Sequence, residues 1–105
     1  MLKLIALWSP PKPEDRAAFE TAYLNVHAPL ARALPNLAGL DTILIGEGLE
    51  GSAPDYHRVA IMSWADQAAF DRDEQTPEWT ALRTDAGQMI ERFGVSLTSS
   101  VGEDG

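Results

Sequence analysis

Residues 2–8, LKLIALW, decide the fold class of this chain. The stretch is rich in branched and aromatic residues, and Ser9-Pro10-Pro11-Lys12-Pro13 ends it, which is typical of a β-strand. Apolar side chains occupy both parities: Leu2, Leu4, Ala6 and Trp8 on one face, Ile5 and Leu7 on the other. A strand of this kind is usually covered on both faces of its sheet. The sequence therefore predicts a strand that is buried on two sides.

The segment after this strand is predicted to be helical from Glu14 to about Val26. Acidic residues open it, which suits the positive end of the helix dipole. Apolar residues then recur at three- and four-residue steps: Phe19, Tyr23, Val26 or His27, Leu30 and Leu34. Because Pro29 removes a backbone donor and disfavours helical geometry at Ala28, we expect this helix to end near His27. A short second turn over residues 29–34 is expected to follow.

The remaining elements are predicted from the same signals. Strands are expected over residues 39–45, 56–64 and part of 95–101, and helices from Asp66 and from Thr76-Pro77 to Gly94. Residues 46–54 form a Gly-rich hairpin connection that lacks the lysine and spacing of a phosphate-binding loop. Residues 102–105 are expected to be a frayed polar tail.

The resulting order, β-α-β-β-α-β, predicts one α+β domain over residues 1–105 with a ferredoxin-like fold. Such a fold places both helical segments on one face of a four-stranded antiparallel sheet. The strands containing Trp8 and Trp64 are apolar at both parities, so the second face would expose more apolar surface than monomers usually tolerate. We therefore expect a homodimer packed sheet to sheet, that is, a dimeric α/β barrel.

Composition narrows the classes of partner. The formal net charge is −8, and the eight Lys and Arg residues are scattered, which argues against nucleic acid and anionic membranes as partners. The chain has no cysteine, which excludes disulfides and thiolate chemistry. The apolar start of the chain is too short for a signal peptide or a membrane span, so we expect a cytoplasmic protein.

His27 and Tyr23 are the candidate catalytic residues. Histidine is the natural acid-base group near neutral pH, and the four-residue step places both rings on one side of the predicted helix. There they could move a proton or bind an enolate oxygen on the wall of an apolar pocket. The alternative is structural: a histidine at a helix C-terminus often caps free carbonyls.

The other polar candidates are weaker. His57 is expected to be partly exposed and structural, and Asp85 to lie on a solvated helix face. Histidine clusters, cysteines and a Gly-x-Gly-x-x-Gly motif are all missing, so neither a metal site nor a bound cofactor is predicted. A group of large apolar side chains is first of all core, and second the lining of a pocket for a flat ligand: Trp8, Met62, Trp64 and Trp79.

Residues 19–37, FETAYLNVHAPLARALPNL, resemble the EthD family, named from ethyl tert-butyl ether degradation. The likeness continues through Ser63-Trp64, Ala69-Phe70, Thr76-Pro77-Glu78 and Asp85, and omits only the Gly-rich loop and the tail. It implies a homodimeric α/β barrel with a small cavity between helices and sheet. It also implies that the family's motif histidine corresponds to His27 and the preceding tyrosine to Tyr23. Some relatives have a second functional histidine, for which only His57 is available here.

Three functional hypotheses follow. The first is a metal-free enzyme that acts on a small organic compound in catabolism or secondary metabolism, with His27 as acid-base residue. The resemblance implies a link to an oxidoreductase system or, as the alternative, an enzyme of the lactone isomerase or polyketide cyclase type. The second is an accessory protein that binds a small apolar or aromatic molecule without converting it. The third is a structural dimer with a closed core.

Overall fold

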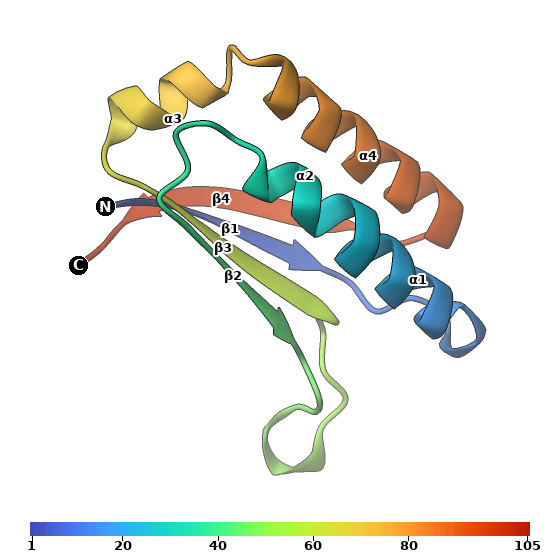
Figure 1. Ribbon diagram of the computed structural model, residues 1–105. Coiled ribbons are helices and arrows are strands. Elements are labelled where there is room, and N and C mark those ends of the chain that lie inside the picture. Colours follow the sequence, from blue (N-terminus) through green and yellow to red (C-terminus); the bar gives the residue numbers. More distant parts are fainter.

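Four antiparallel strands form one sheet in the order β2-β3-β1-β4, as a computed structural model of residues 1–105 shows (Figure 1). The elements along the chain are β1 (Leu2–Trp8), η1 (Pro13–Asp15), α1 (Arg16–Ala22), η2 (Tyr23–His27), α2 (Ala28–Arg32), β2 (Gly39–Leu44), η3 (Leu49–Gly51), β3 (Arg58–Trp64), α3 (Gln67–Asp73), α4 (Pro77–Phe93) and β4 (Leu97–Glu103). The helices lie over one face of the sheet (Figure 1). The predicted α+β, ferredoxin-like fold is therefore confirmed.

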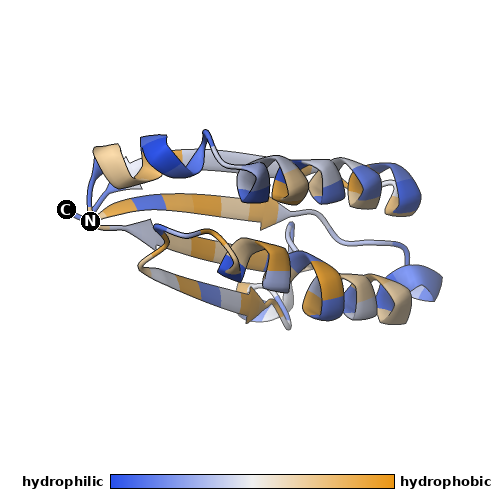
Figure 2. Ribbon diagram, turned by 45° about the horizontal axis from the view of Figure 1, so that its top comes forward, coloured by the Kyte–Doolittle hydropathy of each residue, from blue (hydrophilic) through white to orange (hydrophobic).

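Strand β1 lies between β3 and β4 (Figure 2). Its even-numbered side chains point toward the helices and are buried, and so are those of β3 that pair with them. Trp8 and Trp64 are 1% and 0% exposed within the single chain. Contrary to the sequence argument for a dimer, these two rings therefore need no partner, because the helices already cover them.

The opposite face of the sheet has no helix over it. Its centre consists of apolar side chains that pair across neighbouring strands: Ile5 with Ile61, Leu7 with Val59, and Ile43 with Val59. Ile5 remains 40% exposed and Ile43 43% exposed. This apolar surface, and not the tryptophans, is what remains uncovered in the chain. We call it the open face.

The first helical segment does not end near His27, as the proline had suggested. The chain stays helical from Arg16 to Arg32, and residues 23–27 form a π-helical turn in which the Ala28 N–H donates to the Tyr23 carbonyl. In an α-helix, the Pro29 ring would clash with the carbonyl of the residue four positions earlier. Widening the turn relieves this clash, so the proline changes the helix type and does not break the helix.

Helices α3 and α4 begin at side-chain caps. Asp66 accepts a hydrogen bond from the Ala69 N–H at 2.9 Å, and Thr76 accepts one from the Trp79 N–H at 3.1 Å. Gly94 ends α4 in the left-handed conformation, at φ 61°, which glycine adopts without strain. These boundaries confirm the predicted starts and the predicted end of α4.

Some boundaries differ from the sequence predictions. Strand β2 ends at Leu44, one residue early, and β3 begins at Arg58 because the chain bends at His57. Strand β4 continues to Glu103, where it pairs with Leu2, so two residues of the predicted tail belong to the sheet. Pairing with β1 along its whole length accounts for the extra residues.

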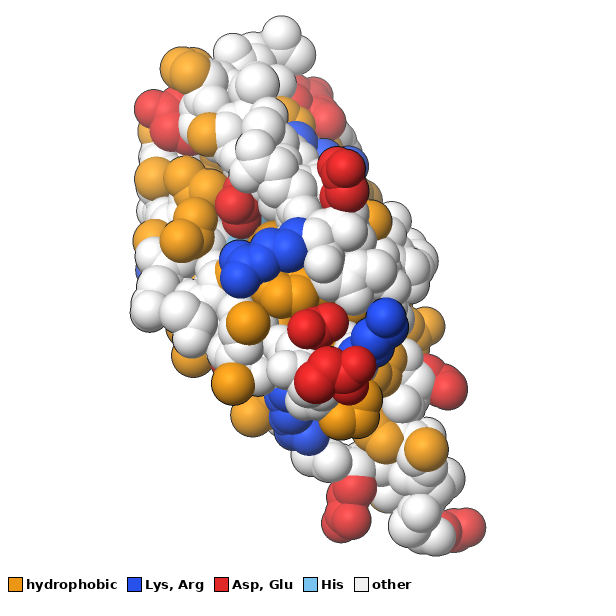
Figure 3. Space-filling view, turned by 90° about the vertical axis from the view of Figure 1, so that its right-hand side faces the viewer, with side chains coloured by type: hydrophobic (Ala, Val, Ile, Leu, Met, Phe, Trp, Pro, Cys, Tyr) orange, Lys and Arg blue, Asp and Glu red, His pale blue; other side chains and the backbone are white.

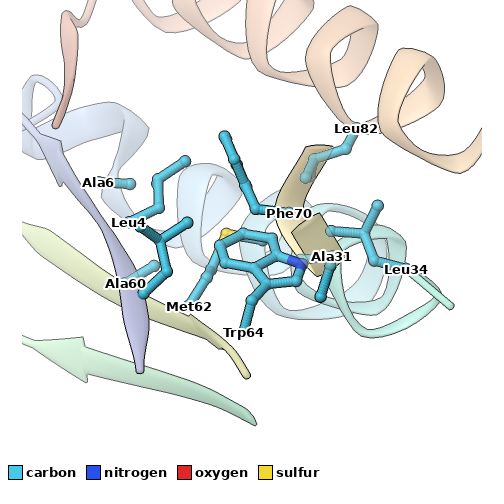
Figure 4. Packing of buried hydrophobic residues seen from close by; sticks show 11 residues of the cluster. Leu4, Ala6, Ala31, Leu34, Ala60, Met62, Trp64, Phe70 and Leu82 are labelled. Atoms are coloured by element: carbon cyan, nitrogen blue, oxygen red, sulfur yellow. The ribbon is translucent and has the colours of Figure 1, made fainter. Parts of the chain in front are cut away.

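The buried carboxylate of Asp73 joins three parts of the fold. It is 0% exposed and accepts hydrogen bonds from the Trp64 indole at 2.7 Å and from the backbone and side-chain nitrogens of Asn36 at 3.0 and 2.8 Å. Figure 4 shows the Trp64 ring among Met62, Phe70 and Ala31. Trp64 is thus a core residue, held by Asp73.

Basic and acidic side chains are interspersed on the surface. At the end of the molecule drawn in Figure 3, basic and acidic side chains lie beside one another with hydrophobic atoms between them. None of the helices has the length and apolar character that crossing a membrane requires.

Candidate functional site

A small apolar cavity lies between the helices and the sheet. Its volume is ≈ 40 Å³, and 13 of its 17 lining residues are hydrophobic. The lining comes from all four strands, from the helical segment 23–31 and from α4: Leu4, Ala6, Trp8, Tyr23, His27, Ala28, Ala31, Leu40, Thr42, Ala60, Met62, Trp79, Leu82, Arg83, Ala86, Leu97 and Ser99. A space of this size holds a few water molecules. Its walls are suited to an apolar ligand with few polar contacts.

His27 lies on the wall of this cavity and is held by Asp85 of α4. The Nδ1 of His27 is 2.8 Å from Asp85 Oδ2, and the two side chains are 11% and 16% exposed. The edge of the ring meets Trp8, with ring centroids 5.2 Å apart. Because His27 sits inside a continuous helix and bonds to a side chain, the helix-cap interpretation is wrong.

The Asp85 contact determines which nitrogen of His27 can act as a base. An ionised carboxylate only accepts hydrogen bonds, so Nδ1 of the neutral ring carries the proton and Nε2 keeps its lone pair. Burial lowers the pKa of His27 below its ordinary value of 6.5, and the hydrogen bond that His27 donates to Asp85 opposes this effect only in part. Near neutral pH the ring is therefore neutral, with Nε2 available as a proton acceptor.

Tyr23 lies one turn before His27 and lines the same cavity. The two ring centroids are 5.7 Å apart, and Trp8 meets the Tyr23 ring edge-on at 6.2 Å. The Arg58 guanidinium carbon lies 5.0 Å from the centre of the phenol ring. Burial raises the pKa of the Tyr23 hydroxyl, so the phenol stays protonated and can donate a hydrogen bond.

A second polar cluster holds Arg58 in place beneath Tyr23. Glu20 accepts hydrogen bonds from Nε and Nη2 of Arg58 and lies 3.0 Å from Nε2 of His57. Burial acts to raise the pKa of Glu20, but the hydrogen bonds with Arg58 and His57 outweigh it and lower that pKa. His57 is only 5% exposed, so the expected partly exposed position is wrong. The bend before β3 turns its ring inward onto Phe19, with ring centroids 5.2 Å apart.

The family model for the EthD domain matches residues 11–92 of this sequence. The chain belongs to the EthD family. The matched segment contains Tyr23, His27 and Asp85, so the polar residues of the site lie within the EthD domain.

Solved structures with the same fold agree with this assignment. A structure of an ethyl tert-butyl ether degradation (EthD) family protein from Bacillus halodurans is 30% identical, with a TM-score of 0.87, over 100% of this chain and 99% of that chain. HapK from Hahella chejuensis is 26% identical, with a TM-score of 0.67, over 99% and 92% of the two chains. SnoaB from Streptomyces nogalater, described as a cofactor-independent oxygenase, is 16% identical with a TM-score of 0.67, over 98% and 91% of the two chains, which shows a shared fold. No functionally curated protein matches the sequence.

In this EthD domain the predicted site residues are only partly brought together. Tyr23, His27, Trp8, Met62 and Trp79 all line the cavity. Trp64, predicted to line the pocket, does not, because its indole is held by Asp73 in the core. No group of three or more His, Cys, Asp or Glu side chains in the EthD domain could hold a metal ion.

Two functional candidates of the EthD domain were missed from the sequence. Asp85, predicted to face solvent, instead binds His27, and Arg83 lines the cavity. Asp85 directly precedes the buried Ala86 on α4. This position beside the apolar stripe is the feature of the sequence that could have indicated that Asp85 is partly buried. A carboxylate at the border of a buried stripe can reach a partner on a neighbouring helix, which helix periodicity alone does not reveal.

Proposed function

We propose that this EthD-family chain is a cofactor-independent enzyme that moves a proton on a small organic compound. The observation that carries the proposal is the 2.8 Å contact between His27 Nδ1 and Asp85 on the wall of an apolar cavity. Such a carboxylate–histidine pair orients the ring and stabilises the imidazolium that forms when the ring takes up a proton.

The proposed step is proton transfer from the substrate to Nε2 of His27. A C–H bond next to a carbonyl breaks, its electron pair forms an enolate, and His27 becomes an imidazolium ion paired with Asp85. The protonated Tyr23 hydroxyl donates a hydrogen bond to the enolate oxygen. Return of the proton from Nε2 to another atom of the enolate completes an isomerisation and regenerates the neutral ring. The balance requires neither an oxidant nor a reductant.

The cavity supports a small apolar substrate. A substrate that fills the cavity would displace water from between its hydrophobic walls, which would strengthen the interactions of His27 and Tyr23 with developing charge. Two of the residues that line the cavity are tryptophans, Trp8 of β1 and Trp79 of α4. A planar or cyclic compound matches such walls better than a long flexible chain does.

Proton abstraction can be tested without knowledge of the natural substrate. The protein is incubated in D₂O with a panel of cyclic enolisable ketones such as 1-tetralone, and NMR follows the loss of the C–H signal next to the carbonyl. Wild type should accelerate the exchange, and His27→Gln should lose about 100- to 10,000-fold of that acceleration. Asp71→Asn, at an exposed position of α3, serves as the control. Equal exchange by wild type and His27→Gln would contradict the proposal.

The same mixtures test the alternative of a binding protein. A compound that raises the melting temperature of the wild type, without exchange or conversion, would indicate an accessory function. Stabilisation together with deuterium uptake would favour the enzyme.

We further propose that the protein works as a homodimer through the open face. Two copies of this face would bury Ile5, Ile43 and Ile61 against one another, and the EthD likeness implies such a barrel. Light scattering should give twice the chain mass of 11.4 kDa. Ile5→Lys should reduce it to one chain mass, whereas Leu49→Lys, at an 89% exposed position, should not. A monomeric wild type would rule out this assembly.

A further inference from the structure

A groove on the surface between α4 and β4 adjoins the cavity at His27. The groove has a volume of ≈ 300 Å³ and is lined by Arg83, Ala86, Gly87, Ile90, Leu97 and Ser99. Four of these residues also line the inner cavity: Arg83, Ala86, Leu97 and Ser99. Cavity and groove are therefore neighbours that share one wall, with a small apolar cavity inside and a wider groove outside. The cavity alone is below the size of usual ligand pockets, whereas the two together reach it.

Arg83 is the only charged residue that lines the groove, and no acidic group pairs with it. The ion pairs of the chain use the N-terminal amine, Lys3, Arg58 and the two histidines, and Arg83 is in none of them. This cation stands out in a chain of net charge −8 with only eight Lys and Arg residues. Its charge also acts to lower the pKa of His27, so it is electrostatically coupled to the base.

Gly87 is a second, independent feature of the same groove. It lies inside α4, where glycine costs about 0.5–1 kcal/mol relative to alanine. A Cβ added at this position would meet no atom within 4 Å, so no contact within the chain requires glycine. The missing side chain instead keeps the wall of the groove open beside Arg83.

We propose that the groove is the outer half of the substrate site and that the substrate is an apolar, planar molecule carrying a carboxylate. The apolar body enters the inner cavity beside His27, and the carboxylate remains at the mouth, where the Arg83 guanidinium pairs with it. A guanidinium matches the two oxygens of a carboxylate with two parallel donors. This inference rests on the proposed function and defines the substrate class for it.

The test compares two ligands of the same shape that differ in charge. Isothermal titration calorimetry at pH 7.5 measures the binding of 2-naphthoate and of the neutral 2-naphthamide to the full chain. Wild type should bind naphthoate about threefold to tenfold more tightly than the amide. This range corresponds to the contribution of an ion pair to binding, from an exposed pair to a partly buried one. Arg83→Gln should remove this preference and leave amide binding unchanged. Arg92→Gln, which removes the same charge from the exposed end of α4, should keep the preference.

A second variant tests the groove itself. Gly87→Leu should weaken the binding of both compounds at least about fivefold, because its side chain fills the groove, while the melting temperature does not fall. Each of three results would overturn this inference. Wild type could bind naphthoate and the amide equally, Arg83→Gln could keep the preference of the wild type for naphthoate, or Gly87→Leu could bind both compounds as tightly as the wild type does. In those cases the proposed proton transfer at His27 would still stand. Binding of neither compound would overturn this inference alone, because the deuterium-exchange assay tests the proton transfer separately.

Discussion

Replacing Asp85 by asparagine removes the negative charge beside His27. The amide oxygen of asparagine takes a similar position and can still accept a hydrogen bond from Nδ1 of His27. Burial of His27 is unchanged, whereas the contribution of Asp85 that raises the pKa of His27 is lost. The pKa of His27 should therefore be lower in Asp85→Asn than in wild type. At pH 7 the ring stays neutral in both proteins, so any loss of rate reports the poorer stabilisation of the imidazolium.

The magnitude follows from the geometry of the pair. A hydrogen bond to a charged group contributes about 1.5–3 kcal/mol, and side chains only 11% and 16% exposed are weakly screened by solvent. Each ~1.4 kcal/mol changes a rate tenfold. Since asparagine retains one acceptor, Asp85→Asn should slow proton abstraction about 10- to 100-fold.

The assay is an NMR pH titration of the ring Cε1–H of His27, combined with the deuterium-exchange rate. The chain has two histidines, so comparison with His27→Gln assigns the signal. Asp71→Asn removes the same charge from an exposed position and should change neither the pKa of His27 nor the exchange rate. An unchanged or higher pKa of His27 in Asp85→Asn would refute the argument that Asp85 stabilises the protonated ring.

Three further outcomes are expected. Pro29→Ala restores an N–H that can donate to the Asn25 carbonyl, so the free energy of unfolding in denaturant should rise by about 1–3 kcal/mol. An α-helical turn would then replace the π-helical turn and move His27, so deuterium exchange of the substrate should slow about 10- to 100-fold. An unchanged exchange rate would contradict this. Trp64→Phe removes one of the hydrogen-bond donors to Asp73 and should lower the free energy of unfolding by about 1–3 kcal/mol. A loss below about 0.5 kcal/mol in denaturant unfolding would contradict this. Because the folded chain lowers the pKa of His27, the unfolded chain binds more protons just below pH 6.5; the free energy of unfolding should therefore fall as pH drops through this range, and less so in His27→Gln.

Local sequence rules determined most of the architecture of this protein. Apolar residues at both parities marked residues 2–8 as a strand, and the caps at Asp66 and Thr76 set the starts of α3 and α4. The three- and four-residue steps placed Tyr23 and His27 on one side of their helix. These features depend on neighbours a few residues apart, which periodicity and capping chemistry describe well.

Only the tertiary structure decided the partners of the polar residues. Asp85 meets His27 across 58 residues of sequence, Glu20 meets Arg58 across 38, and Asp73 holds Trp64 away from the cavity that it was expected to line. Pro29 was expected to break the helix, whereas the chain forms a π-helical turn over residues 23–27 and stays helical to Arg32. Sequence patterns show which side of an element is buried, but not which distant group lies opposite, because the packing angle between elements sets that pairing.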